Sequence, residues 1–335
     1  MKTIEQHKSL KAYNTFAVEC FCEHFISVNT TEELRAALLN EDFSERFILG
    51  GGSNLLLTKN LSGLCIHVNL KGIRVIEEDD DHAIIEASAG ENWHDFVLWT
   101  LNQGYGGLEN LALIPGNIGT APIQNIGAYG VELKDNFVSC TSLDTKTATP
   151  HRFNLEEVVF GYRNSIFKTD LKGKHVITAV QFRLTKKNHI LKTGYGAIQE
   201  ELGNYVSSPK NIAKAVIAIR QRKLPDPKKI GNSGSFFKNP VVTETHFQNL
   251  LFKYPEMPHY RISDSEVKIP AGWIIDHLGY KGYKKGDAGV HENQALVLVN
   301  HGNASGSEIL NLANEIQEQV FERFNIRLET EVNIY

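Results

Sequence analysis

The segment centred on Arg163 carries a side chain that can bind an anionic group. The run Gly161-Tyr162-Arg163-Asn164-Ser165 places an arginine among an aromatic residue and small polar residues. A guanidinium donates hydrogen bonds in pairs, so Arg163 can anchor a carboxylate or a phosphate. Taken alone, the segment fits a surface arginine stacked on Tyr162 better.

A second segment, Gly231 to Pro240, is interpreted as a glycine loop that places Ser235 directly after a glycine, where an open turn can present its hydroxyl. Phe236 and Phe237 follow, so there is no GxSxG elbow, and a Ser–His–Asp hydrolase is a poor fit. A serine can instead donate a proton to a reacting carbon. Turn serines more often cap their own backbone, so both interpretations stay open here.

The tail Arg327 to Tyr335 is predicted as a strand that puts Glu329 and Glu331 on one face. Such glutamates are usually solvated, and a functional role requires a cation beside one of them. Basic residues bracket the serine segment and the region before it: Arg220, Arg222, Lys223, Lys238 and Lys268. Gathered at one cleft they would attract a phosphorylated substrate, whereas dispersed they are solvated helix-end charges.

Two glycine-rich segments can bind a phosphate-bearing cofactor through their backbone. Pro115 to Gly130 has four glycines, two prolines and no charge, so it offers only N–H groups and small amide side chains. Loops of this length are uncommon in compact domains unless functional, and we interpret this one as a cofactor cradle. The shorter segment, Gly50 to Asn54, has neither the GK[ST] of a Walker loop nor a GxGxxG turn, and by itself it fits a tight turn.

Hydrophobic periodicity and capping signals predict the elements that position these segments. Strands are expected at Phe47–Leu49, Leu55–Leu57, several within Ile66–Ala89, Phe137–Asp144 and His175–Leu184. Helices are expected after a capping box at Thr30 and Glu33 with Leu34, Leu38 and Leu39 as the apolar face, at Trp93–Leu101, at Pro209–Lys223 after the N-cap Ser208, and at Ser307–Phe324 with caps at Ser305 and Glu308. Residues 1 to about 190 are interpreted as one strand-rich α+β unit, and the run 224–227 as a stiff junction.

Composition excludes several classes of protein. The 335 residues allow two or three domains, and the net charge of −4 leaves no global basic surface for nucleic acid. No apolar run reaches the ~20 residues of a membrane helix, and the N-terminal segment lacks the apolar core of a signal peptide. The cysteines Cys20, Cys22, Cys65 and Cys140 have no zinc or CxxC spacing, so we expect buried free thiols in a reducing cytoplasm.

The order of the motifs resembles one family over nearly the whole chain. IPGNIGTAPIQNIGAYG, YRNSIFK, RQRKLPDP, GSFFKNP and LETEV are similar to the bacterial UDP-N-acetylenolpyruvoylglucosamine reductases, flavoenzymes of peptidoglycan precursor synthesis. The resemblance implies an α+β fold, with a two-part FAD-binding domain of the vanillyl-alcohol-oxidase type and a C-terminal α+β substrate domain. It implies a first FAD-binding subdomain at 1–68 joined by the C-terminal strand 326–335, a second at 69–207, and a substrate-binding domain at 208–325.

The resemblance also assigns roles to residues. It implies that Arg163, Ser235 and Glu331 are catalytic. It implies that FAD is bound by Gly50, Gly51, Gly52, Ser53, Asn54, Leu55, Pro115, Gly116, Gly119, Thr120, Ile123, Gln124, Asn125, Gly127, Tyr129 and Gly130. It implies that the substrate is bound by Tyr195, Lys223, Asn239, Tyr260, Lys268 and Gln294, with Tyr260 on a lid loop found in the longer subclass. Asn333 stands where well-known members have an arginine, and Thr120-Ala121 replaces a common serine pair.

The implied reaction uses non-covalent FAD, with NADPH as cosubstrate and a UDP-sugar as substrate, and needs no metal or obligate protein partner. Hydride passes from NADPH to FAD and then to the terminal vinyl carbon of the enolpyruvyl group. Arg163 and Glu331 would stabilise the charge that moves into the carboxylate, and Ser235 would protonate the ether-bearing carbon. A flavin-dependent oxidase of small alcohols or sugars is the alternative. A binding module without catalysis is a third hypothesis, and it would not require these three residues together.

Overall fold

The computed structural model describes residues 3–335, which divide into two compact units, each treated separately. Unit 1 comprises the described part of 1–8 together with 22–51 and 61–222. Unit 2 comprises 9–21, 52–60 and 223–335. The three-domain division expected from the resemblance stays a prediction.

The first sheet of unit 1 is built around a parallel core. Its order is β1 (Glu5–Ser9), β2 (Phe21–Val28), β5 (Leu61–Val68) and β3 (Arg46–Leu49), and β5 pairs in parallel with both β2 and β3. Helix α1 (Thr31–Leu38) packs on it through Leu34 and Leu38. The Thr30 hydroxyl accepts the N–H of Glu33, as expected, but Leu39 is 47% exposed and not part of the apolar face.

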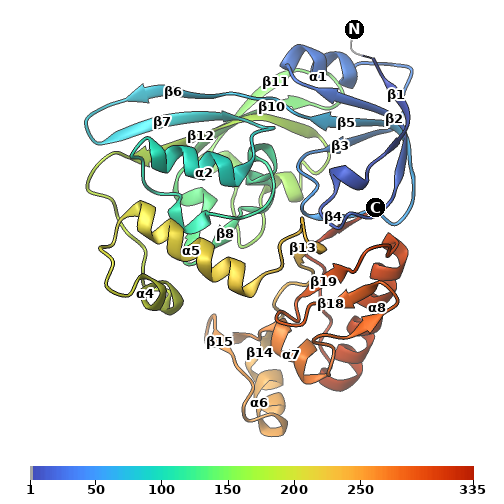
Figure 1. Ribbon diagram of the computed structural model, residues 1–335, viewed down its shortest axis with the longest axis vertical. Coiled ribbons are helices and arrows are strands. Elements are labelled where there is room, and N and C mark those ends of the chain that lie inside the picture. Colours follow the sequence, from blue (N-terminus) through green and yellow to red (C-terminus); the bar gives the residue numbers. More distant parts are fainter. Residues whose placement is uncertain (1–2) are drawn as a thin grey trace. The chain divides into compact units, whose positions relative to one another are not determined.

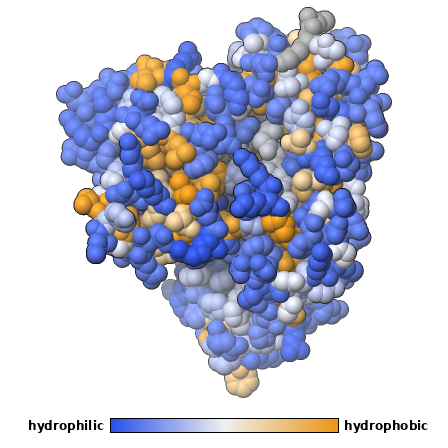
Figure 2. Space-filling view, viewed as in Figure 1, coloured by the Kyte–Doolittle hydropathy of each residue, from blue (hydrophilic) through white to orange (hydrophobic). Residues whose placement is uncertain are grey.

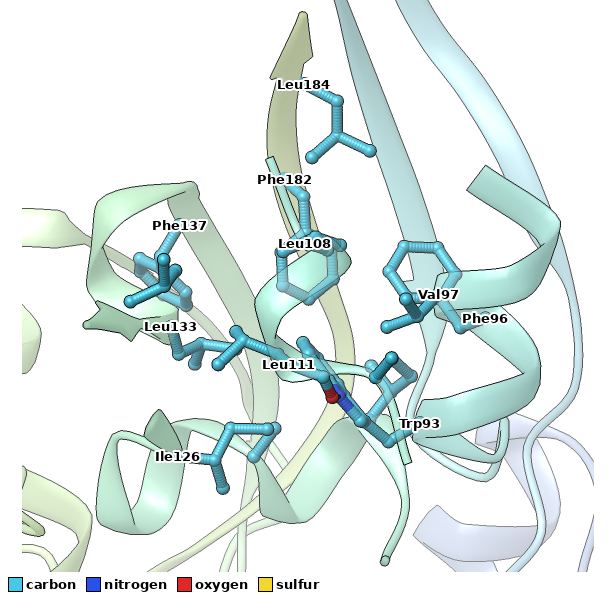
Figure 3. Packing of buried hydrophobic residues seen from close by; sticks show 14 of the residues in the cluster. Trp93, Phe96, Val97, Leu108, Leu111, Ile126, Leu133, Phe137, Phe182 and Leu184 are labelled. Carbon is cyan, nitrogen blue, oxygen red and sulfur yellow. The ribbon is translucent and has the colours of Figure 1, made fainter. Parts of the chain in front are cut away.

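The second sheet of unit 1 is antiparallel. Its order is β11 (Pro150–Asn154), β10 (Phe137–Asp144), β12 (His175–Thr185), β7 (His82–Ser88) and β6 (Ile73–Glu78). Inward-facing side chains of β7 and β12 pack against helix α2 (Trp93–Asn102), which lies along the sheet in Figure 1. Figure 3 shows Trp93, Phe96 and Phe182 gathered around Leu111, whose carbonyl accepts the indole N–H of Trp93 at 2.9 Å.

Short elements occupy the connections between α2, the later strands of this sheet and the long helix of unit 1. In chain order they are η2 (Glu109–Leu111), η3 (Ile118–Thr120), η4 (Pro122–Gln124), β8 (Gly127–Ala128), β9 (Val131–Glu132), η5 (Leu133–Asp135), α3 (Leu155–Val158), η6 (Ile166–Lys168) and α4 (Gly196–Leu202). Helix α5 (Pro209–Lys223) follows, with the Ser208 hydroxyl accepting the N–H of Asn211. The cradle segment is therefore two 3-10 turns and a hairpin strand, an ordered backbone that can hold a ligand.

The four-stranded antiparallel sheet of unit 2 is ordered β13 (Gly231–Ser235), β19 (Val297–Asn300), β18 (Ala288–Val290) and β17 (Lys284–Lys285). Helix α8 (Gly306–Phe324) packs against β18 and β19. A second group consists of β14 (Val241–Thr243), β16 (Glu266–Lys268) and β15 (Tyr260–Arg261), with α6 (Glu244–Lys253) and α7 (Ala271–His277) beside them in the chain. Strand β20 (Asn333–Ile334) pairs in parallel with β4 (Leu55–Leu56), and η1 (Lys11–Tyr13) completes the unit.

The structure confirms the expected cap of α8 and corrects two other expectations. Ser305 and Glu308 form the α8 capping box, and the expected stripe is buried: Ile309, Leu312, Ile316, Val320 and Phe324. The interpretation of Gly231 to Pro240 as a loop was wrong for Gly231–Ser235, which form β13 because β19 supplies an unpaired edge. The prediction of one continuous strand over Arg327 to Tyr335 was also wrong, since the chain bends after Thr330 and only β20 is a strand.

Surface and thiol chemistry follow composition. All four cysteines are buried and free, as expected, and burial raises the pKa of Cys140 to about 12. Hydrophilic residues predominate on the face drawn in Figure 2. Across residues 3–335, no helix is both long and apolar enough to span a bilayer, and no group of three His, Cys, Asp or Glu side chains is arranged to hold a metal ion.

Candidate catalytic and cofactor-binding residues

The two glycine-rich segments meet inside unit 1. A Cβ built on Gly50 would lie 2.7 Å from Cγ2 of Thr120, and one on Gly51 would lie 2.8 Å from Oδ1 of Asn117. A side chain at either position would overlap these Thr120 and Asn117 atoms, so glycine lets the two segments lie close together. The residues that sequence analysis placed about 70 positions apart therefore form one surface in this unit.

The chain before α2 holds the cradle by backbone hydrogen bonds. The N–H of Trp93 donates to the carbonyl of Gly116 at 3.0 Å, and the N–H of Gly119 donates to the carbonyl of Ala89 at 2.9 Å. A Cβ on Gly119 would lie 2.6 Å from that of Ala89, so Gly119 is needed for this packing as well as for any ligand. Backbone hydrogen bonds to Ala89 and Trp93 thus attach the cradle to the start of α2.

Several backbone donors of this surface remain available to a ligand. Within residues 3–335, the N–H groups of Gly51, Gly116 and Asn117 donate to no protein acceptor. Close, uncharged N–H groups are the donors that bind a pyrophosphate or the polar edge of a flavin ring. The side chain of Asn125, by contrast, is fully engaged, with bonds to Glu132, Gly161 and Lys134, so its contribution to a ligand is structural. The residues present fit a bound FAD.

The segment Gly52 to Leu55, also expected to bind FAD, belongs to unit 2. Gly52 has φ of +63°, and a Cβ there would lie 1.9 Å from the carbonyl oxygen of Tyr13, so this position requires glycine. The carbonyl of Asn54 accepts from both the backbone N–H and the side-chain amide of Asn333, at 3.2 and 2.9 Å. Asn333, the departure from the family pattern, therefore holds the chain in place at Asn54 through an amide.

Arg163 is attached to the cradle. Its Nη2 donates to the carbonyl of Gly127 at 2.8 Å, and its guanidinium lies 5.7 Å from the ring of Tyr162. The stacking alternative is thus present, but together with a cradle contact. Arg163 has φ of +52°, a conformation that costs a non-glycine residue about 1–2 kcal/mol. Strain of this kind is concentrated at functional sites, because the surrounding structure must impose it.

Tyr195 and Arg220 are two further candidate site residues of unit 1. The ring of Tyr195 lies edge-on to that of Tyr129 with centroids 5.4 Å apart. Burial lowers the pKa of the Arg220 guanidinium, Tyr129 opposes this shift, and Arg163 lowers the pKa further. Two neighbouring guanidinium groups make this region electropositive, which suits an anionic group.

From the sequence, Arg220 is only one of five basic residues near the proposed junction. The position of Arg220 in the helix could have singled it out from the other basic residues. Ile212, Val216 and Arg220 recur every four residues along α5, and the first two are fully buried. An arginine on the buried face of a helix is seldom a solvated charge. Other members of the basic set form exposed ion pairs instead: Arg222 with Glu201 and Lys238 with Glu329.

Ser235 and Glu331 lie on adjacent backbones of unit 2. Ser235 ends β13 opposite Val297, after an irregularity in register at which Gly234 has φ of +69°. The next residue, Phe236, accepts the N–H of Glu331 at 2.8 Å through its carbonyl. Phe237 and Thr330 form an isolated antiparallel bridge, so the tail pairs with the segment after Ser235 before it bends away to β20. This change of partner explains why the tail is not one strand.

The structure brings some of the expected substrate residues together in unit 2. Lys268 on β16 lies with its ammonium 5.8 Å from the ring of Tyr260 on β15, the residue expected on the lid. Asn239 Oδ1 accepts the N–H of Ala271 at the start of α7, at 2.9 Å. The side-chain oxygen of Gln294 likewise accepts a backbone N–H, that of Leu296, at 3.4 Å. Lys223 is exposed and has no side-chain bond to the other four within the described chain.

Two protein-family models match parts of this chain. Residues 226–335 match the model of the UDP-N-acetylenolpyruvoylglucosamine reductase C-terminal domain, and residues 23–153 match an FAD binding domain. A UDP-N-acetylenolpyruvoylglucosamine reductase of Flavobacterium johnsoniae is 54% identical, covering 99% of both chains.

Two solved structures report on the fold. The crystal structure of the reductase of the same name from Thermus caldophilus covers 100% of both chains with a TM-score of 0.70 at 24% identity. A 4-ethylphenol oxidase from Gulosibacter chungangensis covers 97% of this chain and 84% of its own, with a TM-score of 0.50 at 10% identity. The fold is therefore the expected α+β fold, with an FAD-binding domain of the vanillyl-alcohol-oxidase type. With its glycine segments, its Arg163 and Ser235 motifs and a relative that matches end to end, the chain belongs to the UDP-N-acetylenolpyruvoylglucosamine reductase family.

Proposed function

We propose that Arg163, Ser235 and Glu331 are the catalytic residues with which this chain reduces UDP-N-acetylglucosamine enolpyruvate to UDP-N-acetylmuramate. The chain is an FAD-dependent oxidoreductase of peptidoglycan precursor synthesis, and NADPH supplies the electrons. The observation that carries the proposal is the bond from Arg163 to the Gly127 carbonyl, because it joins an anion-binding side chain to the cofactor cradle.

The sixteen FAD-binding positions form the proposed cofactor site. Gly51, Gly116 and Asn117 would donate backbone hydrogen bonds to it, and the glycines exclude side chains that would fill the surface. When bound, FAD accepts hydride from NADPH and supplies it to the substrate double bond. The protein contributes position and charge to that step.

The chain's own side chains would handle charge and proton. Hydride addition at the terminal vinyl carbon moves negative charge toward the substrate carboxylate. The fork of Arg163 would bind that carboxylate, and Glu331, protonated or hydrogen-bonded, would help Arg163 to stabilise the developing charge. The Ser235 hydroxyl would then give its proton to the carbon that carries the ether oxygen, which is basic enough at that stage for a weak acid.

The remaining assignments concern the substrate and the setting. Tyr195, Lys223, Asn239, Tyr260, Lys268 and Gln294 are proposed to bind the UDP-sugar. Of these, the cation Lys268 and the phenol Tyr260 lie together and suit a phosphate oxygen. We also propose the three-domain division given above, action in the cytoplasm, and activity without an obligate protein partner.

An anaerobic half-reaction tests the proposal against an oxidase of the same fold. The purified protein is expected to be yellow, and NADPH is expected to bleach it. UDP-N-acetylglucosamine enolpyruvate should then restore the yellow colour without oxygen, as followed by flavin absorbance. Restoration only after oxygen is admitted would support the oxidase, and a colourless protein that cannot be reconstituted with FAD would exclude both.

The approach of the two glycine segments makes a quantitative prediction. In Gly51→Ala, the added Cβ would lie 2.8 Å from Oδ1 and 3.2 Å from the backbone N of Asn117, covering a donor that the FAD site needs. Loss of a buried hydrogen bond from this donor to FAD costs about 1–3 kcal/mol, so FAD should bind roughly 5- to 150-fold more weakly. Titration of apoprotein with FAD, followed by flavin fluorescence, measures the change.

Gly194→Ala is the matched control, because a Cβ at Gly194 meets no atom within 4 Å and its φ is ordinary. It should bind FAD as the unmodified chain does. Equal affinities for the Gly51→Ala and Gly194→Ala proteins would contradict the assignment of Gly51 to the cofactor site.

A further inference from the structure

His94 makes a side-chain hydrogen bond to the backbone of Leu113, just before the cradle begins in the chain. It is the second residue of α2, and its Nδ1 accepts the backbone N–H of Leu113 at 2.9 Å. An imidazole nitrogen accepts a hydrogen bond only when it carries no proton, so His94 is neutral here, with its proton on Nε2. The side chain is half-buried, and among the described residues 3–335 no other side chain bonds the Leu113 N–H.

Leu113 is the residue that this contact constrains. Its φ is +60°, a conformation that costs a leucine about 1–2 kcal/mol and must be imposed from outside. Its carbonyl accepts from Nε of Arg220 at 3.2 Å, so side chains from α2 and α5 hold its two backbone groups. Two residues later the cradle begins at Pro115, and its next attachment is the Trp93 to Gly116 bond. Leu113 therefore sets the direction in which the cradle leaves the core.

We propose that His94 is a positioning residue for FAD: its neutral imidazole holds Leu113 in the strained conformation from which the cradle starts, and protonation of His94 releases that hold and weakens FAD binding. The inference rests on the proposed FAD site but goes beyond it, because His94 is assigned no contact with cofactor or substrate. A protonated His94 would set an N–H against the N–H of Leu113, leaving both without an acceptor.

The charges around His94 determine where it titrates. Burial lowers its pKa; Asp95, its neighbour on α2, acts in the opposite direction, and Arg220 on α5 lowers the pKa further. The folded-state pKa is therefore below the ordinary value of 6.5, and the imidazole is neutral at neutral pH. Because the neutral form is the one stabilised by folding, this contribution is fully present above about pH 6.5 and is lost as the pH falls through the folded-state value.

Two substitutions separate the acceptor from the titration. His94→Asn places an amide oxygen where Nδ1 lies and cannot be protonated, whereas His94→Leu removes the acceptor. His189→Asn is the matched control, because the His189 Nδ1 lies 2.7 Å from the Thr185 hydroxyl and has no bond to the cradle among residues 3–335. The dissociation constant for FAD is measured for each apoprotein by flavin fluorescence at several values from about pH 5 to about pH 8.

The unmodified chain and His189→Asn should bind FAD more weakly as the pH falls, by roughly 5- to 150-fold, the factor expected when a buried donor loses its acceptor. His94→Asn should bind like the unmodified chain at about pH 8 and lose this dependence at low pH. His94→Leu should be weak throughout, and if it does not fold, the comparison with His94→Asn decides.

Three results would count against these ideas, and they are distinguishable. Identical pH dependence in the unmodified chain and His94→Asn would overturn the role of His94. Equally weak binding by His94→Asn and His94→Leu at about pH 8 would show that the acceptor is not what matters. Absence of FAD binding by the unmodified chain at every pH would instead refute the FAD site itself.

Discussion

The Ser235→Ala variant should be reduced by NADPH at nearly the rate of the unmodified chain, but its flavin should be reoxidised by the enolpyruvyl substrate about 10²- to 10⁴-fold more slowly. The proton donor is needed only when the substrate carbon becomes basic, so loss of the hydroxyl affects one half-reaction. The two rates are measured separately by anaerobic stopped-flow absorbance of the flavin.

Position in the fold supports the choice of serine. Ser235 ends β13 beside the backbone of Glu331, after a glycine with positive φ that frees the strand from regular pairing. Ser307→Ala is the matched control: it removes an exposed hydroxyl from α8 in the same unit, where Oγ donates only to the carbonyl of Thr58. If Ser235→Ala slowed both half-reactions equally, Ser235 would not be the proton donor.

Arg163→Met should slow the substrate half-reaction about 10²- to 10³-fold, because a preorganised donor to the developing charge is lost. Arg163→Lys should fall between this variant and the unmodified chain, since an ammonium keeps the charge but cannot form the paired bonds of a guanidinium. Reduction by NADPH should change far less in both. Stopped-flow rates at saturating substrate, with substrate affinity from the same titration, provide the comparison.

Arg222→Lys controls for the loss of a guanidinium elsewhere in the unit, because the Arg222 side chain is 61% exposed and pairs with Glu201. An exposed pair of this kind contributes about 0–1 kcal/mol and should not affect either half-reaction. Wild-type rates for Arg163→Lys would mean that paired donation is not required. A matching loss of the NADPH step would place Arg163 in cofactor binding instead of substrate activation.

Helix boundaries could be predicted from the sequence because their causes are local. The capping box at Ser305 and Glu308, and Ser208 followed by Pro209, mark helix starts through bonds within one turn. The apolar stripe from Ile309 to Phe324 is likewise a property of one helix. Strands β10 and β12 were also recognisable, since alternation over many residues needs no knowledge of the partner strand.

The errors arose where a distant partner decides the conformation. Gly231–Ser235 contain three small polar residues and two glycines, a composition typical of loops, yet they form a strand because β19 pairs with them. The tail from Arg327 changes partner, from the segment after Ser235 to β4, and bends between the two. Strand formation depends on such pairing more than on intrinsic preference.

The sequence by itself determined the family of this protein and the uncharged character of Pro115 to Gly130, because residue types and motif spacing are enough for those conclusions, whereas the roles of Arg163, Ser235 and Glu331 stay predictions. Only the tertiary structure shows that Gly51 lies against Asn117 and that Arg220 is a buried neighbour of Arg163. It likewise shows that His94 accepts the N–H of Leu113. These contacts join residues that are far apart in the chain, and they depend on which faces the packed helices and loops present to one another. Spacing along the chain carries no record of that packing.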